Sequence, residues 1–138
     1  MKEVFVDTNY WIAIVNKNDQ WHEAAKLAKK ALGDVRLVTS DEVLVEFLSG
    51  LSNHGTHIRT QGAKIVRAIL GSASVSVVPQ SRQSFLGALE FYEKRKDKEY
   101  SLVDCISMMT MTSRSITEVL TSDRHFSQEG FKVLIVKQ

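Results

Sequence analysis

Short apolar runs alternate with helix-length segments along all 138 residues, and this alternation narrows the folds open to the chain. The runs are short and rich in Val, Ile, Leu and Phe, which is typical of strands buried on both faces. Parallel neighbours need a crossover helix between them, so the pattern predicts an α/β domain with a mostly parallel sheet of about five strands. The predicted strands are EVFV (3–6), VRLVT (35–39), VSVVP (75–79), EVLTSD (118–123) and the apolar end of KVLIV (133–136).

The segments between these runs carry helix signals. A helix is predicted directly after EVFV, with Asp7 or Thr8 as its N-cap. Thr39 and Glu42 have capping-box spacing and predict the start of the helix in VLVEFLSGL. The helix predicted over 81–98 is amphipathic and gathers its large apolar residues on one side: Phe85, Leu86, Leu89 and Tyr92. The remaining helices are predicted over 19–33, 58–70 and 101–113.

Composition indicates one folded domain over residues 1–138. Hydrophobic residues make up 43% and charged residues 25%, the proportions of a globular chain. No apolar run approaches a membrane span and no signal-peptide core precedes the first acid, so we expect a cytoplasmic protein that does not enter a membrane. The single cysteine, Cys105, excludes an internal disulfide and is predicted to be a buried apolar residue. The net charge of +2 is too small to identify a nucleic-acid-binding protein.

Two acids follow predicted strands. Asp7 comes directly after EVFV, and Asp123 closes EVLTSD. In a parallel sheet both would lie at the carboxyl edge, where ligands of α/β proteins bind. The alternative for each is a helix N-cap, which is a common use of Asp after a strand.

Two further acids stand among apolar residues. Glu46, in VLVEFL, lies at the border of an apolar helical stripe, and its alternative is a solvated helix edge. Asp104, in SLVDCISMM, has apolar neighbours on every side of its predicted helix. A lone buried carboxylate costs several kcal/mol or takes up a proton. The alternative for Asp104 is a capping box with Ser101, three residues earlier.

One bound cation would account for all four acids together. Magnesium and manganese prefer hard oxygen ligands and suit a cluster of carboxylates beside a phosphate. Without the ion, such a cluster repels itself and the pKa values of its members rise. We therefore predict a site for Mg²⁺ or Mn²⁺, with one or two ions, built from Asp7, Glu46, Asp104 and Asp123.

The order and setting of these acids resemble the PIN domain, a family of small metal-dependent ribonucleases, and within it the toxins of VapBC-type toxin–antitoxin pairs. The matching pieces are VFVDTNYWI, VLVEFLSGL, YSLVDCISM and VLTSDRHF, which span nearly the whole chain. The resemblance implies a three-layer fold with helices on both faces of the sheet. It also implies cleavage of single-stranded RNA to leave 5′-phosphate and 3′-hydroxyl ends, a homodimer, and an antitoxin whose C-terminal arm covers the active site.

The resemblance also assigns supporting roles. Thr8, Ser101 and Thr121 carry hydroxyls beside the matching acids, and Asn9 is a further candidate to orient them. Because the acids repel a polyanion, cations should flank the pocket and attract RNA. The candidates for this role are Arg124, Arg114 and Lys98.

Three alternatives remain open at this point. The chain could be a housekeeping PIN nuclease in RNA processing, or a catalytically silent module that binds RNA or a protein partner. VFVDTN also has the setting of the nucleophilic Asp in haloacid-dehalogenase-like phosphatases, but that family has a second Asp where this chain has Asn9. No phosphate-binding glycine loop or nucleophile elbow is found in the sequence.

Overall fold

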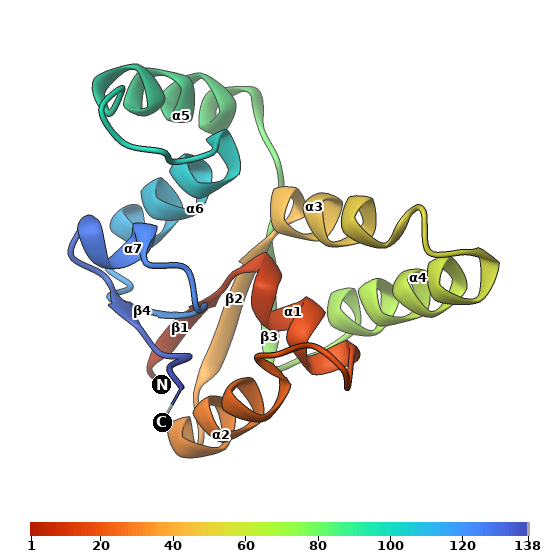
Figure 1. Cartoon of the computed structure of the whole chain (residues 1–138). Coiled ribbons are helices and arrows are strands. Elements are labelled where there is room, and N and C mark those ends of the chain that lie inside the picture. Colours follow the sequence, from red (N-terminus) through yellow and green to blue (C-terminus); the bar gives the residue numbers. More distant parts are fainter. Residues whose placement is uncertain (138) are drawn as a thin grey trace.

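The computed structural model describes residues 1–137 and contains one sheet of five strands. Every pairing in the sheet is parallel and the strand order is β3-β2-β1-β4-β5 (Figure 1). The predicted α/β class, parallel sheet and number of strands are therefore confirmed. The strands are β1 (Glu3–Val6), β2 (Arg36–Ser40), β3 (Val75–Val78), β4 (Glu118–Leu120) and β5 (Lys132–Val133).

Within residues 1–137, seven helices connect the strands. In right-handed crossovers, the helices lie on one face of the sheet when the chain moves toward one edge, and on the opposite face when it moves toward the other edge. Helices α1–α4 therefore cover one face, and α5–α7 cover the other. Figure 1 shows α5 and α6 stacked together, away from α1 and α2. The helices are α1 (Thr8–Val15), α2 (His22–Leu32), α3 (Asp41–Leu51), α4 (Thr56–Leu70), α5 (Arg82–Lys94), α6 (Leu102–Ser113) and α7 (His125–Gln128).

Strand β1 lies at the centre of the sheet, and its last three residues are fully buried. Val4, Phe5 and Val6 have no exposed surface, because β2 and β4 flank the strand and helices cover both faces. The buried cluster around them includes Cys105, as predicted. A central buried strand fixes the place of whatever follows it, which here is Asp7. None of the helices within residues 1–137 is long and apolar enough to cross a membrane.

The predicted capping box of α3 is wrong. The N-cap is Ser40, whose Oγ accepts a hydrogen bond from the Val43 backbone N–H at 3.2 Å. Strand β2 extends to Ser40 because this residue still pairs with Val78 of β3. Thr39 is consequently inside the strand, and its hydroxyl donates to the Val6 carbonyl at 3.0 Å.

The large apolar side of α5 faces outward. Phe85, Leu86, Leu89 and Tyr92 are 39%, 47%, 39% and 47% exposed, whereas the small Ala88 is buried. Helix α5 therefore packs on α6 through its smaller residues and leaves a patch of four large apolar side chains, which we call the α5 patch. Apolar residues of α1, by contrast, are mostly buried or half-buried.

Candidate functional site

A cavity of about 470 Å³ lies at the carboxyl edge of the sheet. All four predicted acids line it, although they are up to 116 residues apart in the sequence (positions 7 and 123). Asp7 directly follows β1, Asp123 lies in the loop after β4, α3 supplies the third acid and the start of α6 the fourth. The lining residues are Asp7, Thr8, Asn9, Ile12, Glu46, Gly50, Glu99, Ser101, Asp104, Asp123 and His125.

Asp7 is the most deeply placed acid, with 5% of its surface exposed. It occupies the N-cap position of α1 but makes no side-chain capping hydrogen bond, so the carboxylate is available to the cavity. The pKa of Asp7 is raised to about 7, chiefly by burial, and the charges of Asp104 and Glu46 contribute in the same direction. Hydrogen bonds from the Thr8 backbone and the Thr121 hydroxyl act in the opposite direction. Burial, more than the predicted mutual repulsion, causes the shift.

Glu46 is half-buried on α3 and is held from α1. The Thr8 hydroxyl donates a hydrogen bond to Glu46 Oε1. Thr8 itself is 7% exposed, so the contact lies largely out of water. The predicted role of Thr8, orienting an acid, is thus matched by its position, and the acid it touches is Glu46.

Asp104 combines both roles considered for it. The capping box with Ser101 is present, with Ser101 N–H donating to Asp104 Oδ2 at 3.1 Å and Asp104 N–H to Ser101 Oγ at 3.0 Å. The same carboxylate lines the cavity and is 8% exposed. Burial raises the pKa of Asp104, and Asp123 contributes in the same direction. The cap therefore fixes the carboxylate at the cavity wall.

Thr121 links Asp7 to the loop that carries Asp123. Its hydroxyl donates to Asp7 Oδ2 at 2.9 Å and accepts from the Asp123 backbone N–H at 3.1 Å. Asn9 Oδ1 lies 3.0 Å from the same hydroxyl, and Asn9 Nδ2 donates to Ser122 Oγ at 3.1 Å. Thr121 and Asn9 thus join the ends of β1 and β4.

His125 is a site residue that the sequence analysis did not assign. Its Nδ1 lies 3.2 Å from Asp104 Oδ2 and 3.4 Å from Asp123 Oδ1. Its position two residues after Asp123, in DRHF, is the signal that could have found it. Glu99 also lines the cavity and was not predicted.

The donors of this site fit a divalent ion. Asp104, Asp123 and His125 each offer one ligand atom, and these atoms lie within 4.8 Å of one another. Asp7, Glu46 and Glu99 line the same cavity, so five carboxylates surround it, four of which are the predicted ligands. None of the four forms an ion pair with Lys or Arg anywhere in residues 1–137. Buried carboxylates that lack a cationic partner favour metal binding.

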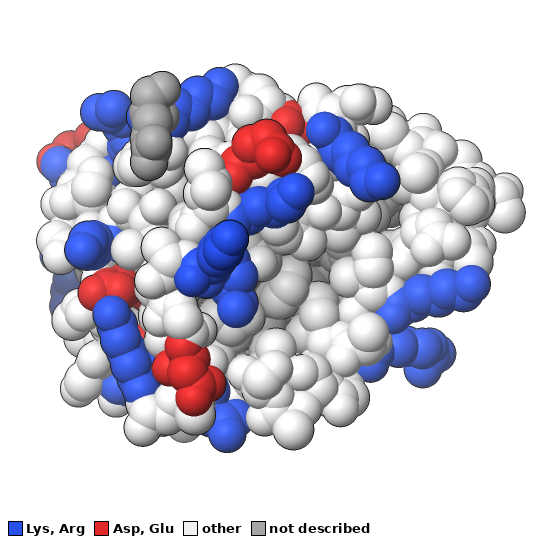
Figure 2. All heavy atoms as spheres, turned by 90° about the horizontal axis from the view of Figure 1, so that it is seen from below, with Lys and Arg blue, Asp and Glu red and all other residues white. Residues whose placement is uncertain are grey.

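The predicted RNA-binding cations are spread over the molecule. Arg124 is exposed beside Asp123, and Lys98 lines a hollow that adjoins the cavity through Glu99 and His125. Arg114, at the other end of α6, pairs with Glu3 at 3.0 Å, so its position does not support a role at this cavity. On the face seen from below, Lys and Arg side chains are scattered among uncharged residues, with a few acids between them (Figure 2).

Comparison with known proteins agrees with this fold and identifies the family. The chain belongs to the PIN domain family, whose pattern matches residues 4–132. It is 30% identical over 128 residues to the 23S rRNA-specific endonuclease VapC20 of Mycobacterium tuberculosis, covering 93% of this chain and 95% of that protein. The crystal structure of that VapC20, a toxin that cleaves the sarcin-ricin loop, superposes with a TM-score of 0.81, at 31% identity and the same coverage.

Two more distant structures share the fold. A Klebsiella pneumoniae toxin–antitoxin complex has a TM-score of 0.61 at 16% identity, covering 88% of this chain and 87% of that one. FitAcB from Neisseria gonorrhoeae has a TM-score of 0.63 at 18% identity, covering 95% and 96%. These similarities show the fold alone.

The buried Asp7 makes stability depend on pH in the metal-free protein. Its pKa is about 7 in the folded chain and near 3.8 when exposed, so the folded state binds more protons between these values. Stability therefore falls as pH rises from about 4 to 7. Asp7→Asn cannot ionise, and in EDTA at pH 8 we expect it to be more stable than wild type by on the order of 2–4 kcal/mol. Denaturant unfolding at pH 5 and pH 8 measures the difference, and an advantage that does not grow with pH would contradict the assignment.

Thr121 offers a second test of the site's construction. Thr121→Val leaves the Asp123 backbone N–H and the Asp7 carboxylate without their shared partner, at a cost of about 1–3 kcal/mol. Thr121→Ser keeps the hydroxyl and should retain most of that stability. A smaller loss in Thr121→Val than in Thr121→Ser, measured by thermal unfolding, would show that the methyl group and not the hydroxyl is what counts.

Proposed function

We propose that this chain is a metal-dependent endoribonuclease that hydrolyses phosphodiester bonds in single-stranded or loop RNA, acting as the toxin of a toxin–antitoxin pair. The observation that carries the proposal is the convergence of Asp7, Glu46, Asp104 and Asp123 on one cavity without Lys or Arg partners in the part of the chain that is described. The similarity to VapC20 supports the choice of RNA.

The four acids and His125 would hold one or two Mg²⁺ or Mn²⁺ ions. When bound, such an ion activates water for attack at phosphorus and neutralises charge that grows on the phosphate oxygens. Thr8 holds Glu46, Thr121 holds Asp7, and the Ser101 capping box holds Asp104, so the carboxylates are oriented before substrate arrives. No side-chain nucleophile is required, and hydrolysis leaves 5′-phosphate and 3′-hydroxyl ends.

The same similarity supports a choice of substrate and partner. VapC20 acts on 23S rRNA, and a sarcin-ricin loop oligonucleotide is therefore the first RNA to test. Arg124 and Lys98 flank the cavity and would contact RNA phosphates. Toxin–antitoxin complexes share the fold, which supports a cognate antitoxin that covers the cavity. The protein would act in the cytoplasm, where RNA and antitoxin meet.

The first test is cleavage of the loop RNA by purified protein. Asp7→Asn and Asp104→Asn remove ligands for the ion, so we expect cleavage to fall by about 100-fold or more, and to stop in EDTA. Asp34→Asn changes an exposed acid in the loop between α2 and β2 and should cleave as wild type does. Turnover that survives in EDTA and in both site variants would overturn the proposal.

Two alternatives give different results in the same assay. A silent module would bind the RNA without turnover, and its thermal midpoint would not respond to Mg²⁺. A housekeeping nuclease would cleave the RNA in a metal-dependent way but would not arrest growth when expressed without an antitoxin.

We also propose a homodimer that buries the α5 patch. Four large apolar side chains on one helix face are 39–47% exposed, and burying them would remove apolar surface from water. Leu86→Glu combined with Leu89→Glu places charges in that patch and should give a single chain of 15.5 kDa, whereas wild type should have twice that mass. Sedimentation measures the masses. Leu27→Glu, at a 58% exposed site on α2, is the control and should leave the dimer intact; equal masses for all three proteins would refute this interface.

A further inference from the structure

Helix α7 is a single turn of four residues, yet it begins with His125 and directly follows the Asp123 loop. A turn this short has little stability of its own. The position of His125 therefore depends on what packs around the turn. On the inner side, Phe126 is fully buried and meets the Phe131 ring edge-on at 6.4 Å.

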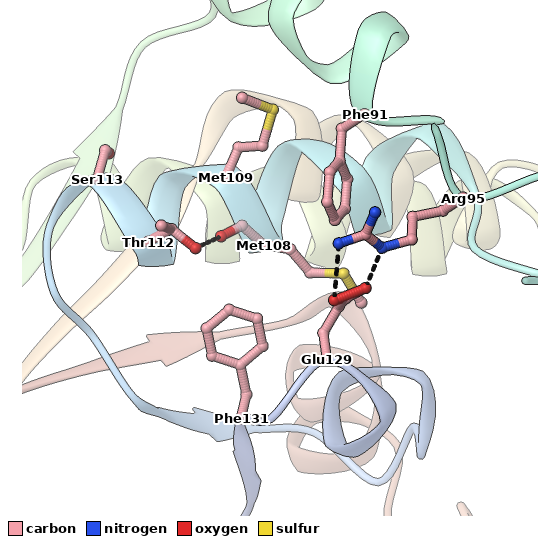
Figure 3. Close-up of a pocket in the computed structure, with 8 residues that line it drawn as sticks. All are labelled: Phe91, Arg95, Met108, Met109, Thr112, Ser113, Glu129 and Phe131. Carbon is pink, nitrogen blue, oxygen red and sulfur yellow. Dashed lines mark hydrogen bonds and ion pairs between the residues drawn. The ribbon is translucent and has the colours of Figure 1, made fainter. Parts of the chain in front are cut away.

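An ion pair holds the outer side of the turn. Arg95, at the end of α5, extends its guanidinium toward Glu129, at the end of α7 (Figure 3). Arg95 Nε donates to Glu129 Oε1, and Nη2 lies 3.5 Å from Oε2, so both carboxylate oxygens are engaged. The Glu129 side chain is 16% exposed and the Arg95 side chain 37%, so the carboxylate is mostly buried while the guanidinium is partly open to solvent. The pair ties α7 to α5 across a cavity of about 430 Å³.

Aromatic rings connect this ion pair to His125. The Arg95 guanidinium lies 4.7 Å above the Phe91 ring, and Phe91 stacks on Tyr100 at 6.5 Å with 19° between the planes. Tyr100 is 4% exposed, and its ring lies 5.5 Å from the His125 imidazole. The Tyr100 hydroxyl is buried near the Glu129 carboxylate but makes no hydrogen bond of ordinary geometry in the described residues, so the ring provides the contact with His125.

We infer that Tyr100 and the Arg95–Glu129 pair are positioning elements that hold the His125 imidazole between Asp104 and Asp123. Tyr100 forms a wall beside the imidazole, and the ion pair prevents α7 from turning away from that wall. With the Tyr100 ring and the ion pair in place, His125 Nδ1 stays within 3.4 Å of the carboxylates on both sides of it. The inference rests on the proposed metal site for its functional meaning.

Metal affinity tests the inference on the whole chain. Manganese binding is titrated by calorimetry for wild type, Tyr100→Leu and Glu129→Gln. Residues that orient metal ligands typically change affinity by about 10–100-fold, and we expect roughly tenfold weaker Mn²⁺ binding in both variants. Tyr100→Phe keeps the ring and should bind as wild type does. Glu118→Gln is the matched control. Like Glu129, Glu118 is mostly buried, at 18% exposure, and forms an ion pair, with Lys2 at 2.8 Å, but it lies at the amino edge of the sheet, opposite the cavity.

A cycle with His125→Ala separates positioning from general stability. If Tyr100 and Glu129 act through His125, their substitution should cause no further loss of Mn²⁺ affinity once the imidazole is gone. A tenfold loss that persists in the His125→Ala background would overturn the inference.

The His125 ring signal in the metal-free protein gives an independent readout. Tyr100→Leu and Glu129→Gln should shift or broaden the ¹³Cε1–¹Hε1 resonance of His125, whereas Glu118→Gln should leave it unchanged. If wild type binds no Mn²⁺, the proposed function is refuted. The ring signal of the metal-free protein still decides whether these residues position the His125 imidazole. A resonance that is the same in all four proteins would overturn the inference.

Discussion

Four carboxylates share one cavity without a Lys or Arg partner in the described chain, and the surrounding structure is arranged around this constraint. One acid directly follows β1, one lies in the loop after β4, one is in the middle of α3 and one is at the start of α6. Each is restrained by a neighbouring polar group: Thr121 at Asp7, Thr8 at Glu46, Ser101 at Asp104 and the His125 backbone at Asp123. These hydrogen bonds prevent the acids from moving apart, which is the movement that would most easily relieve their mutual repulsion.

Burying these acids is unfavourable, and it changes the pKa values at which they lose their protons. Burial raises the pKa of both Asp7 and Asp104, so the metal-free site retains protons that an exposed site would lose. A divalent cation would displace those protons, and its attraction to the carboxylates would offset the solvation that they lose on burial. The same groups are therefore unfavourable for the folded chain alone and favourable for the chain with its ion.

Much of the fold and site was predictable from local pattern. Asp7 and Asp123 could be placed at one edge because parallel strands put the residues that follow them at the same side of the sheet. Ser101 and Asp104 have the spacing of a capping box, and that box is present. These predictions rely on periodicity and on contacts between residues near in sequence.

The features that were missed depend on long-range packing. Thr39 was assigned to a helix cap because the pairing of Ser40 with Val78 cannot be seen in the sequence. The apolar side of α5 faces outward because its small residues pack on α6, and Arg114 lies far from the cavity because α6 runs toward the other edge of the sheet. His125 lies two residues after Asp123 in the sequence, but its contacts with Tyr100, Asp104 and Asp123 are what assign it to the site.

The central claim is that the four carboxylates form a metal site. Crystals of the protein soaked in Mn²⁺ test it most directly, through the anomalous scattering of the ion. The account predicts a peak inside the cavity, coordinated by Asp104 and Asp123 and facing Asp7. A fully soaked crystal with an empty cavity, or with manganese bound only elsewhere on the surface, would contradict it.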